Sequence, residues 1–162
     1  MCGISCRSAR PKTVDGPSAT CSVWIALDDS GPENGCLRVI PGSHEQKRLR
    51  RHHQEPTSRK LTLNLALDED EFDESDARDV VLEAGQISMH DIYLLHGSNA
   101  NRSARRRAGF VLRLMPATSH FDHELGREIT ERNVGSSDFA NRQLYLLRGT
   151  DKSGRNDFNI GL

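Results

Sequence analysis

The sequence lacks the features that mark membrane, secreted and nucleic-acid-binding proteins. No apolar run is long enough to cross a bilayer, and the residues after Met1 contain no apolar segment typical of a secretory signal. The formal net charge is only −1, which predicts no general attraction to nucleic acid or to an anionic membrane. The four cysteines lie within the first 36 residues without paired C-x-x-C spacing, so neither a zinc site nor a disulfide framework is predicted. These absences indicate a soluble, reduced, cytoplasmic protein and leave its oligomeric state open.

The composition is that of one domain with a modest core. The chain has 162 residues, of which 35% are hydrophobic and 28% charged, enough for a single core with many charges left for loops. Residues 1–19 are rich in Ser, Arg, Pro and Gly, and we expect irregular structure there. We expect the core to occupy residues 20–118 and residues 119–162 to form a C-terminal extension of the same domain.

Short apolar segments separated by turn residues follow from residue 20 onward. The segments 21–27 and 61–67 alternate between apolar and polar or small residues, as half-buried strands do. Further strands are expected at 36–40, 86–95 and 107–115, and residues 80–82 are expected to lead into a turn at Ala84-Gly85. Because no long 3.6-residue period lies among them, the pattern predicts an all-β sandwich or jelly roll. The tail is expected to be irregular or partly helical, with a candidate short helix at 137–147.

Two charged runs lie between the expected strands. The basic run at 47–53 could attract a phosphate or carboxylate of a substrate, although a solvated loop is the favoured interpretation. The acidic run at 68–79 is most simply a solvated loop, and we assign it no function.

The segment from His96 to Arg107 contains the chemically informative residues. A histidine after an apolar run is followed by a polar turn, and the next expected strand begins with an arginine eleven residues later. Imidazole suits Fe(II), and a guanidinium offers a planar fork to a carboxylate. On spacing alone, however, a capped histidine in a hairpin beside a surface arginine is the favoured interpretation, because short motifs often match by chance.

Three blocks in order resemble one known family. His96, Gly97, Ser98, Asn101, Ser103 and Arg107 match H-G-S-x-x-N-x-S-x-x-x-R, residues 34–44 match N-G-x-L-x-x-x-P-G-S-H, and residues 23–29 match a strand that carries a tryptophan. The chain thus resembles the phytanoyl-CoA dioxygenase family of Fe(II)/2-oxoglutarate-dependent oxygenases from about residue 20 to residue 116. This resemblance implies a double-stranded β-helix, that is, a jelly roll.

The resemblance also implies an activity and roles for particular residues. The expected reaction is hydroxylation of a small organic substrate with Fe(II) and the co-substrate 2-oxoglutarate, with ascorbate as a candidate reductant. By this resemblance His96 is the catalytic distal iron ligand, and Arg107 binds the far carboxylate of 2-oxoglutarate. Ser98 is expected to add a hydroxyl contact and Trp24 to line the co-substrate pocket. A plain core aromatic at Trp24 and a turn serine at Ser98 remain alternatives.

One part of the family pattern is missing. The family's remaining iron ligands form an H-x-D motif shortly before the tryptophan strand, but the first histidine of this chain is His44. We therefore expect a jelly roll that is incomplete at its N-terminal side, through truncation, a frame shift or true loss of activity. The alternatives to an enzyme are a non-catalytic jelly-roll binding module and an inactive fragment.

Two other histidines need an interpretation. His120-Phe121-Asp122 is an H-x-D string in the wrong order along the chain, so it is expected to lie far from His96. His90 shares strand parity with His96 and is a candidate for the same pocket, although core packing is the favoured role.

Overall fold

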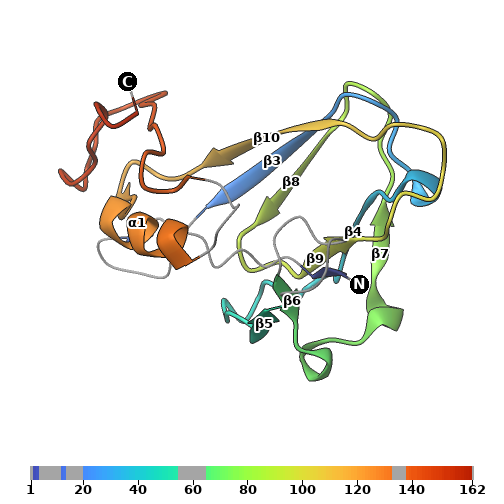
Figure 1. Ribbon diagram of the computed structural model, residues 1–162. Coiled ribbons are helices and arrows are strands. Elements are labelled where there is room, and N and C mark those ends of the chain that lie inside the picture. Colours follow the sequence, from blue (N-terminus) through green and yellow to red (C-terminus); the bar gives the residue numbers. More distant parts are fainter. Residues whose placement is uncertain (1, 4–11, 14–19, 55–64, 133–137, 162) are drawn as a thin grey trace. The chain divides into compact units, whose positions relative to one another are not determined.

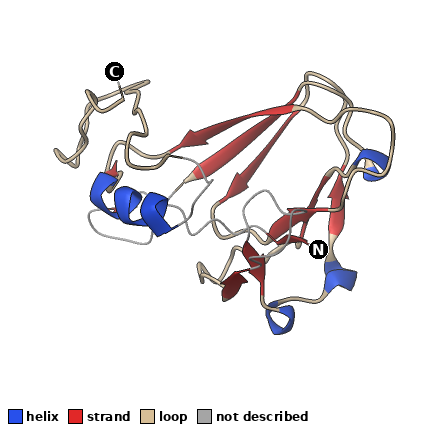
Figure 2. Ribbon diagram, viewed as in Figure 1, coloured by secondary structure: helices blue, strands red, loops and turns tan. Residues whose placement is uncertain are grey.

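The computed structural model describes residues 2–3, 12–13, 20–54, 65–132 and 138–161. Its strands are β1 (Cys2–Gly3), β2 (Lys12–Thr13), β3 (Cys21–Ala26), β4 (Leu37–Val39), β5 (His52–Gln54), β6 (Leu65–Leu67), β7 (Arg78–Val80), β8 (Ile87–Asp91), β9 (His96–Ser98), β10 (Gly109–Leu114) and β11 (Ser119–His120). The helices are α1 (His123–Arg132) and three 3₁₀ turns at Pro32–Asn34, Glu69–Glu71 and Glu74–Asp76. Strands and loops dominate these ranges (Figure 2), and none of their helices has the length and apolar character to cross a membrane.

The chain divides into two compact units. The first combines Cys21–Arg113 with Met1–Ser5, and the second combines Leu114–Leu162 with Cys6–Thr20. The domain boundaries expected after residues 19 and 118 remain a prediction.

The first unit contains two main antiparallel sheets (Figure 1). One has the strand order β1-β9-β4-β7 and the other the order β10-β3-β8. In the first sheet, β4 pairs Val39 with His96 of β9 and with Arg78 of β7. In the second, β3 pairs with β8 over five residues, from Cys21↔Asp91 to Ile25↔Ile87. These sheets confirm the predicted all-β class.

The strand positions predicted from the sequence match the observed strands best where turn residues flank the predicted segment. The expected strands 21–27, 36–40 and 107–115 correspond to β3, β4 and β10. Before the turn expected at Ala84-Gly85, β7 ends at Val80, and Leu82 forms an isolated bridge with Ser30. The last three residues of 61–67 form β6, and residues 61–64 lie outside the described ranges.

The basic and acidic runs bind each other. Glu71, whose side chain is only 2% exposed, pairs with guanidinium groups at 2.7 Å (Arg48), 2.9 Å (Arg51) and 3.4 Å (Arg50). Hydrogen bonds from Arg51, with a smaller contribution from Arg48, lower the pKa of Glu71 to about 2. The expectation of two solvated loops is wrong at these residues, because tertiary contact brings the runs together. The three arginines are therefore engaged by a carboxylate of the chain itself.

The β10-β3-β8 sheet has one mixed polar face and one apolar face. In the β3–β8 register, Ser22 lies opposite His90 and Trp24 opposite Ser88, whereas Val23 lies opposite Met89 and Ile25 opposite Ile87. Successive side chains alternate between faces, so the first two pairs share one face and the last two share the other. On the apolar face, Ile87 is 53% and Met89 60% exposed. The chemically useful groups of this sheet therefore lie on the opposite face, with Trp24 and His90.

In the second unit, α1 begins where the sequence suggested a loop. The Asp122 carboxylate accepts a hydrogen bond from the Leu125 N–H at 2.9 Å, and the Asp122 carbonyl accepts one from the Gly126 N–H at 2.9 Å. Asp122 therefore serves as the N-cap of a helix that starts at His123. The short helix expected at 137–147 is wrong for residues 138–147, which are not helical.

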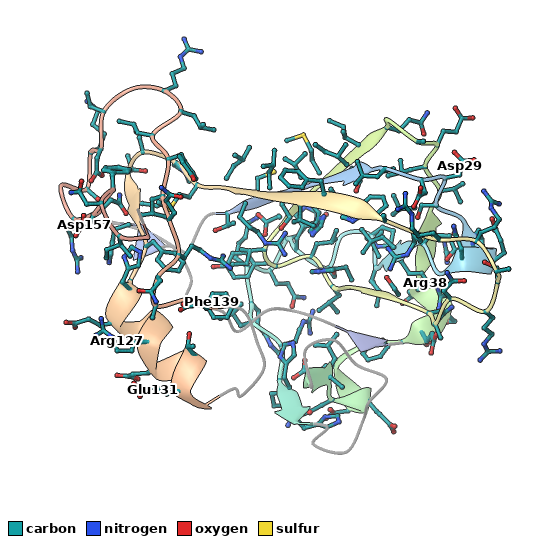
Figure 3. The ribbon with its side chains drawn as sticks, turned by 45° about the horizontal axis from the view of Figure 1, so that its top comes forward. Asp29, Arg38, Arg127, Glu131, Phe139 and Asp157 are labelled. Carbon is teal, nitrogen blue, oxygen red and sulfur yellow. The ribbon has the colours of Figure 1, made fainter. Side chains whose placement is uncertain are left out.

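A small aromatic cluster forms the core of this second unit. Phe121 and Phe139 are buried together, and Met115 and Leu144 pack against them. Figure 3 shows Phe139 beside α1. A Cβ at Gly126 of the helix would lie 2.6 Å from the Phe139 carbonyl oxygen, so the absence of a side chain there allows the close approach.

Candidate active site

His96 opens a strand and does not close one. The expected strand 86–95 is interrupted, because the Asp91 carboxylate accepts the Tyr93 N–H at 2.7 Å and the Asp91 carbonyl accepts the Leu94 N–H at 3.2 Å. The chain turns there, and β9 starts at His96 between β1 and β4. This local Asx turn is the physical reason that the apolar run before His96 is not a strand.

The His96 ring is held in one tautomer by the backbone. Its Nδ1 lies 2.8 Å from the Leu94 carbonyl oxygen, which can only accept, so Nδ1 carries the proton and Nε2 the lone pair. Burial lowers the pKa of His96, while the Leu94 hydrogen bond acts in the opposite direction. The ring is therefore neutral at neutral pH and offers Nε2 as a ligand atom. An arrangement of this kind is typical of metal-binding histidines.

His90 lies beside His96 and joins the two sheets. It is on β8, and its ring centroid is 4.6 Å from that of His96, with 50° between the ring planes. Burial, with smaller contributions from the neighbouring His96 and Arg113, lowers the pKa of His90 to about 4. Neither buried ring nitrogen of His90 has a hydrogen-bond partner among the residues that the structure describes. His90 thus lies beside His96, but the two rings come from strands of different sheets and not from one continuous strand, so the parity argument does not explain their contact.

Arg107 differs from the two arginines that precede it. Arg106 forms a two-pronged pair with the Asp28 carboxylate at 2.8 and 2.9 Å. Arg105 pairs with Glu33 at 2.9 Å and with Asp29 at 3.4 Å. Arg107, which is partly buried, has no ion-pair or hydrogen-bond partner in the described part of the chain. Its guanidinium is free to bind an anion.

Trp24 lies against Arg107. The Arg107 guanidinium carbon is 5.8 Å from the centre of the Trp24 ring, within the range of a cation–π contact. Gly109 on β10 permits this position, because a Cβ there would lie 2.2–2.4 Å from three indole atoms. The cationic group and the aromatic face therefore lie side by side.

The position of His96 and Arg107 on either side of one polar turn predicts that they lie on neighbouring antiparallel strands, and this prediction is wrong. His96 and Arg107 are not on neighbouring strands, because β9 belongs to the β1-β9-β4-β7 sheet and Arg107 precedes β10 of the other sheet. The polar turn between them therefore crosses from one sheet to the other. The structure pairs His96 with His90 and Arg107 with Trp24.

The other motif residues hold this crossing turn. The buried Asn34 accepts the Gly31 N–H at 2.8 Å and donates to the carbonyls of Asp29 (2.8 Å) and Arg106 (3.4 Å). A Cβ at Gly35, whose φ is 75°, would lie 2.4 Å from the Asn99 carbonyl oxygen. Asn34 and Gly35 of the motif at 34–44 thus pack against the loop of the motif that runs from His96 to Arg107. This contact gives a structural reason for the two motifs to occur in the same chain.

The serines and asparagine of that loop are mainly structural. The Asn101 amide donates to the Arg105 carbonyl at 2.7 Å and accepts from the N–H and hydroxyl of Ser103, both at 2.9 Å. Ser98 lies in register with Leu37 and Cys2 at the centre of its sheet. Its hydroxyl has no hydrogen bond within the described ranges, and its role toward a co-substrate stays a prediction.

The described residues do not complete an iron site. They contain no group of three His, Cys, Asp or Glu side chains that could hold a metal ion. The Asp91 carboxylate, which is close in sequence to His90, is paired with Lys47 at 2.7 Å. His120 and Asp122 belong to the second unit, and their expected separation from His96 stays a prediction.

Sequence reasoning missed Arg113. Its charge lowers the pKa of both His90 and His96. Strand parity could have found it, because Arg107, Gly109 and Arg113 are separated by even numbers of residues.

The family can now be decided by comparison. The model of the family described as Phytanoyl-CoA dioxygenase (PhyH) matches residues 7–109. The chain belongs to the phytanoyl-CoA dioxygenase family. A phytanoyl-CoA dioxygenase domain-containing protein 1 homolog of Dictyostelium discoideum is 35% identical over 97 residues, covering 59% of this chain and 34% of the relative. One from Caenorhabditis elegans is 33% identical over 98 residues, covering 57% and 33%.

A solved structure also resembles the chain. EvdO2 from Micromonospora carbonacea var. aurantiaca, complexed with 2-oxoglutarate, superposes with a TM-score of 0.55 at 25% identity, over 68% of this chain and 42% of that one. The family and this similarity confirm the jelly-roll fold. The chain spans about a third of the length of the curated relatives named above.

Proposed function

We propose that this chain is the part of an Fe(II)/2-oxoglutarate dioxygenase that binds the co-substrate, in a cytoplasmic protein that hydroxylates a small organic molecule. The observation that carries the proposal is the contrast among three consecutive arginines. Arg105 and Arg106 are neutralised by carboxylates of the chain, whereas Arg107 is not. A partly buried guanidinium without a partner favours binding of an external anion.

The residues present fit 2-oxoglutarate. Its far carboxylate matches the planar fork of Arg107, and its methylene groups match the face of Trp24, 5.8 Å from that guanidinium. When bound, this co-substrate supplies the electrons for oxygen activation and leaves as succinate and carbon dioxide. The role of the chain in that step is to orient the dicarboxylate and to shield its apolar part from water.

The residues present do not fit a complete iron site. His96 offers one Nε2 lone pair, and no H-x-D motif precedes Trp24 in this chain. The expected facial triad needs a second histidine and a carboxylate. We therefore expect this chain alone to hold Fe(II) weakly. This feature also favours a second candidate, a module that binds 2-oxoglutarate without turnover.

The test uses Trp24 as an internal probe, since it is the only tryptophan of the chain. Titration with 2-oxoglutarate should change Trp24 fluorescence in a saturable way. Loss of a charge-assisted hydrogen bond costs about 1.5–3 kcal/mol, so Arg107→Gln should weaken binding by about tenfold or more. Arg107→Lys keeps the charge without the fork and should be intermediate.

The matched control is Arg102→Gln, in the same loop at an exposed position. It should leave the titration unchanged. Equal affinities for wild type, Arg107→Gln and Arg102→Gln would remove Arg107 from the site.

A further inference from the structure

Two half-buried imidazoles from different sheets lie together without a complete set of partners. The His90 and His96 rings are 4.6 Å apart at 50°, so they are neither stacked in parallel nor separated by another side chain. The His96 Nδ1 is used by the Leu94 carbonyl, and both nitrogens of His90 lack a partner within the described ranges. A buried polar group left unpaired costs free energy, so its presence calls for an external partner such as an ion or a water molecule.

The spacing of the rings suits a shared metal ion. A zinc ion binds an imidazole nitrogen at about 2.0–2.1 Å and so lies about 3.2 Å from the ring centre. Two ring centres separated by 4.6 Å then subtend about 90° at the ion, which is near the angle between ligands of an octahedral site and slightly below the tetrahedral one. A parallel stack would not allow both rings to point a nitrogen at one ion.

We propose that His90 and His96 form a two-imidazole site for a borderline divalent cation, Zn(II), Ni(II) or Cu(II), with water molecules as its remaining ligands. Neutral imidazole suits these cations, and they stand above Fe(II) in the general affinity order. The site is distinct in composition from the two-histidine, one-carboxylate centre expected of the family. It rests on the geometry of the two rings and does not require the proposed oxygenase function.

The charged neighbours of the rings point to a site of modest affinity. Arg113 lies close enough to lower the pKa of both histidines and opposes a cation electrostatically, but its side chain is exposed and its charge is screened by salt. Asp91, beside His90, acts in the opposite direction and is paired with Lys47. Removing the positive charge with Arg113→Gln should therefore strengthen binding of the cation.

The experiment is a titration of the full 162-residue chain with Zn(II). The ring nitrogens of ¹⁵N-labelled histidine, followed by NMR, report each imidazole separately. We expect one nitrogen of His90 and the Nε2 of His96 to shift together at one equivalent. By calorimetry, His90→Asn and His96→Asn should each weaken this binding by about tenfold or more, and the double variant no further, because both act in one chelate.

The control is His123→Asn, whose ring is bonded to the Arg142 carbonyl at 2.9 Å in the second unit. It should bind Zn(II) as the wild type does. Wild-type His90 nitrogens that do not shift at saturating Zn(II), or a His90→Asn variant with unchanged affinity, would overturn the proposal and leave a buried water as the partner of His90. The wild-type spectrum keeps the test valid even if a variant fails to fold.

Discussion

Gly109 determines where the only tryptophan of the chain can lie. A Cβ at this position would lie 2.2–2.4 Å from the indole of Trp24, far inside normal contact. Its backbone is not in the left-handed region, so the constraint is one of space and not of conformation. The residue without a side chain therefore allows Trp24 to reach Arg107.

Gly109→Ala tests this constraint. The added methyl group must displace the ring or the strand, and overpacking of this kind costs about 1–3 kcal/mol. We expect the free energy of unfolding, measured by urea denaturation, to fall by that amount and 2-oxoglutarate binding to weaken. The control is the same change in a Trp24→Ala background, where the cost should largely vanish. An equal cost in both backgrounds would show that the methyl group meets something other than Trp24.

At the same scale, the histidines show what a sequence can and cannot predict. The motif singled out His96 and Arg107 as candidates, whereas the contact of His90 with His96 joins two different sheets and could not be predicted from parity along one strand. The pairing of Arg105 and Arg106 with Asp28, Asp29 and Glu33 was not predictable, because these partners are more than 70 residues apart. That pairing is what distinguishes Arg107 from its neighbours.

At the scale of elements, the turn residues predicted β3, β4 and β10 well, because Gly, Pro, Asn and Asp impose local geometry. The single expected strand 86–95 failed for a local reason, the Asx turn at Asp91, which the sequence contains but which an apolar run conceals. The prediction of two solvated loops failed for a non-local reason, since the contact depends on residues 48–51, just before β5, meeting the 3₁₀ turn Glu69–Glu71 in the fold.

The stabilisation that Glu71 gives to the contact between the two charged runs should depend on pH. Its pKa is about 2 in the folded chain against an ordinary value of 4.5. The ionised carboxylate therefore stabilises the fold fully above about pH 4.5, and this contribution is lost as the pH falls toward 2. Glu71→Gln should lower the free energy of unfolding at pH 7, and the difference from wild type should shrink as the pH is lowered from 4.5 to 2.

Urea denaturation at pH 7, 4.5, 3 and 2 measures this difference. Glu69→Gln is the matched control in the same 3₁₀ turn, where the side chain is exposed, and it should have little effect at any pH. If the difference in free energy of unfolding between wild type and Glu71→Gln stays constant from pH 7 to pH 2, the charge of Glu71 does not stabilise the contact between the two charged runs.

At the scale of the whole molecule, the chain has the family fold, while the residues that the structure describes contain no group of three His, Cys, Asp or Glu side chains that could hold a metal ion. The chain matches the family model over residues 7–109, yet its first histidine is His44. The two unexplained imidazoles and the free guanidinium lie in the same unit, at the places where the motifs converge. The proposed co-substrate binding at Arg107 and the proposed metal binding at the two histidines involve different residues, so we expect variants to separate them.

The last prediction concerns turnover of 2-oxoglutarate. With Fe(II), ascorbate and 2-oxoglutarate, the 162-residue chain should form little or no succinate, because Fe(II) stands low in the affinity order and needs several well-placed ligands. A second protein, in which a segment carrying H-x-D replaces residues 1–19 at the interval that the family uses before Trp24, should form succinate at a clearly higher rate. His96→Ala in that second protein should abolish the gain, whereas Arg102→Gln should not. Robust succinate formation by the unmodified chain, lost in His96→Ala, would mean that the chain finds its other iron ligands among its own residues. Family membership would be unaffected, and the claim that an absent H-x-D limits activity would be wrong.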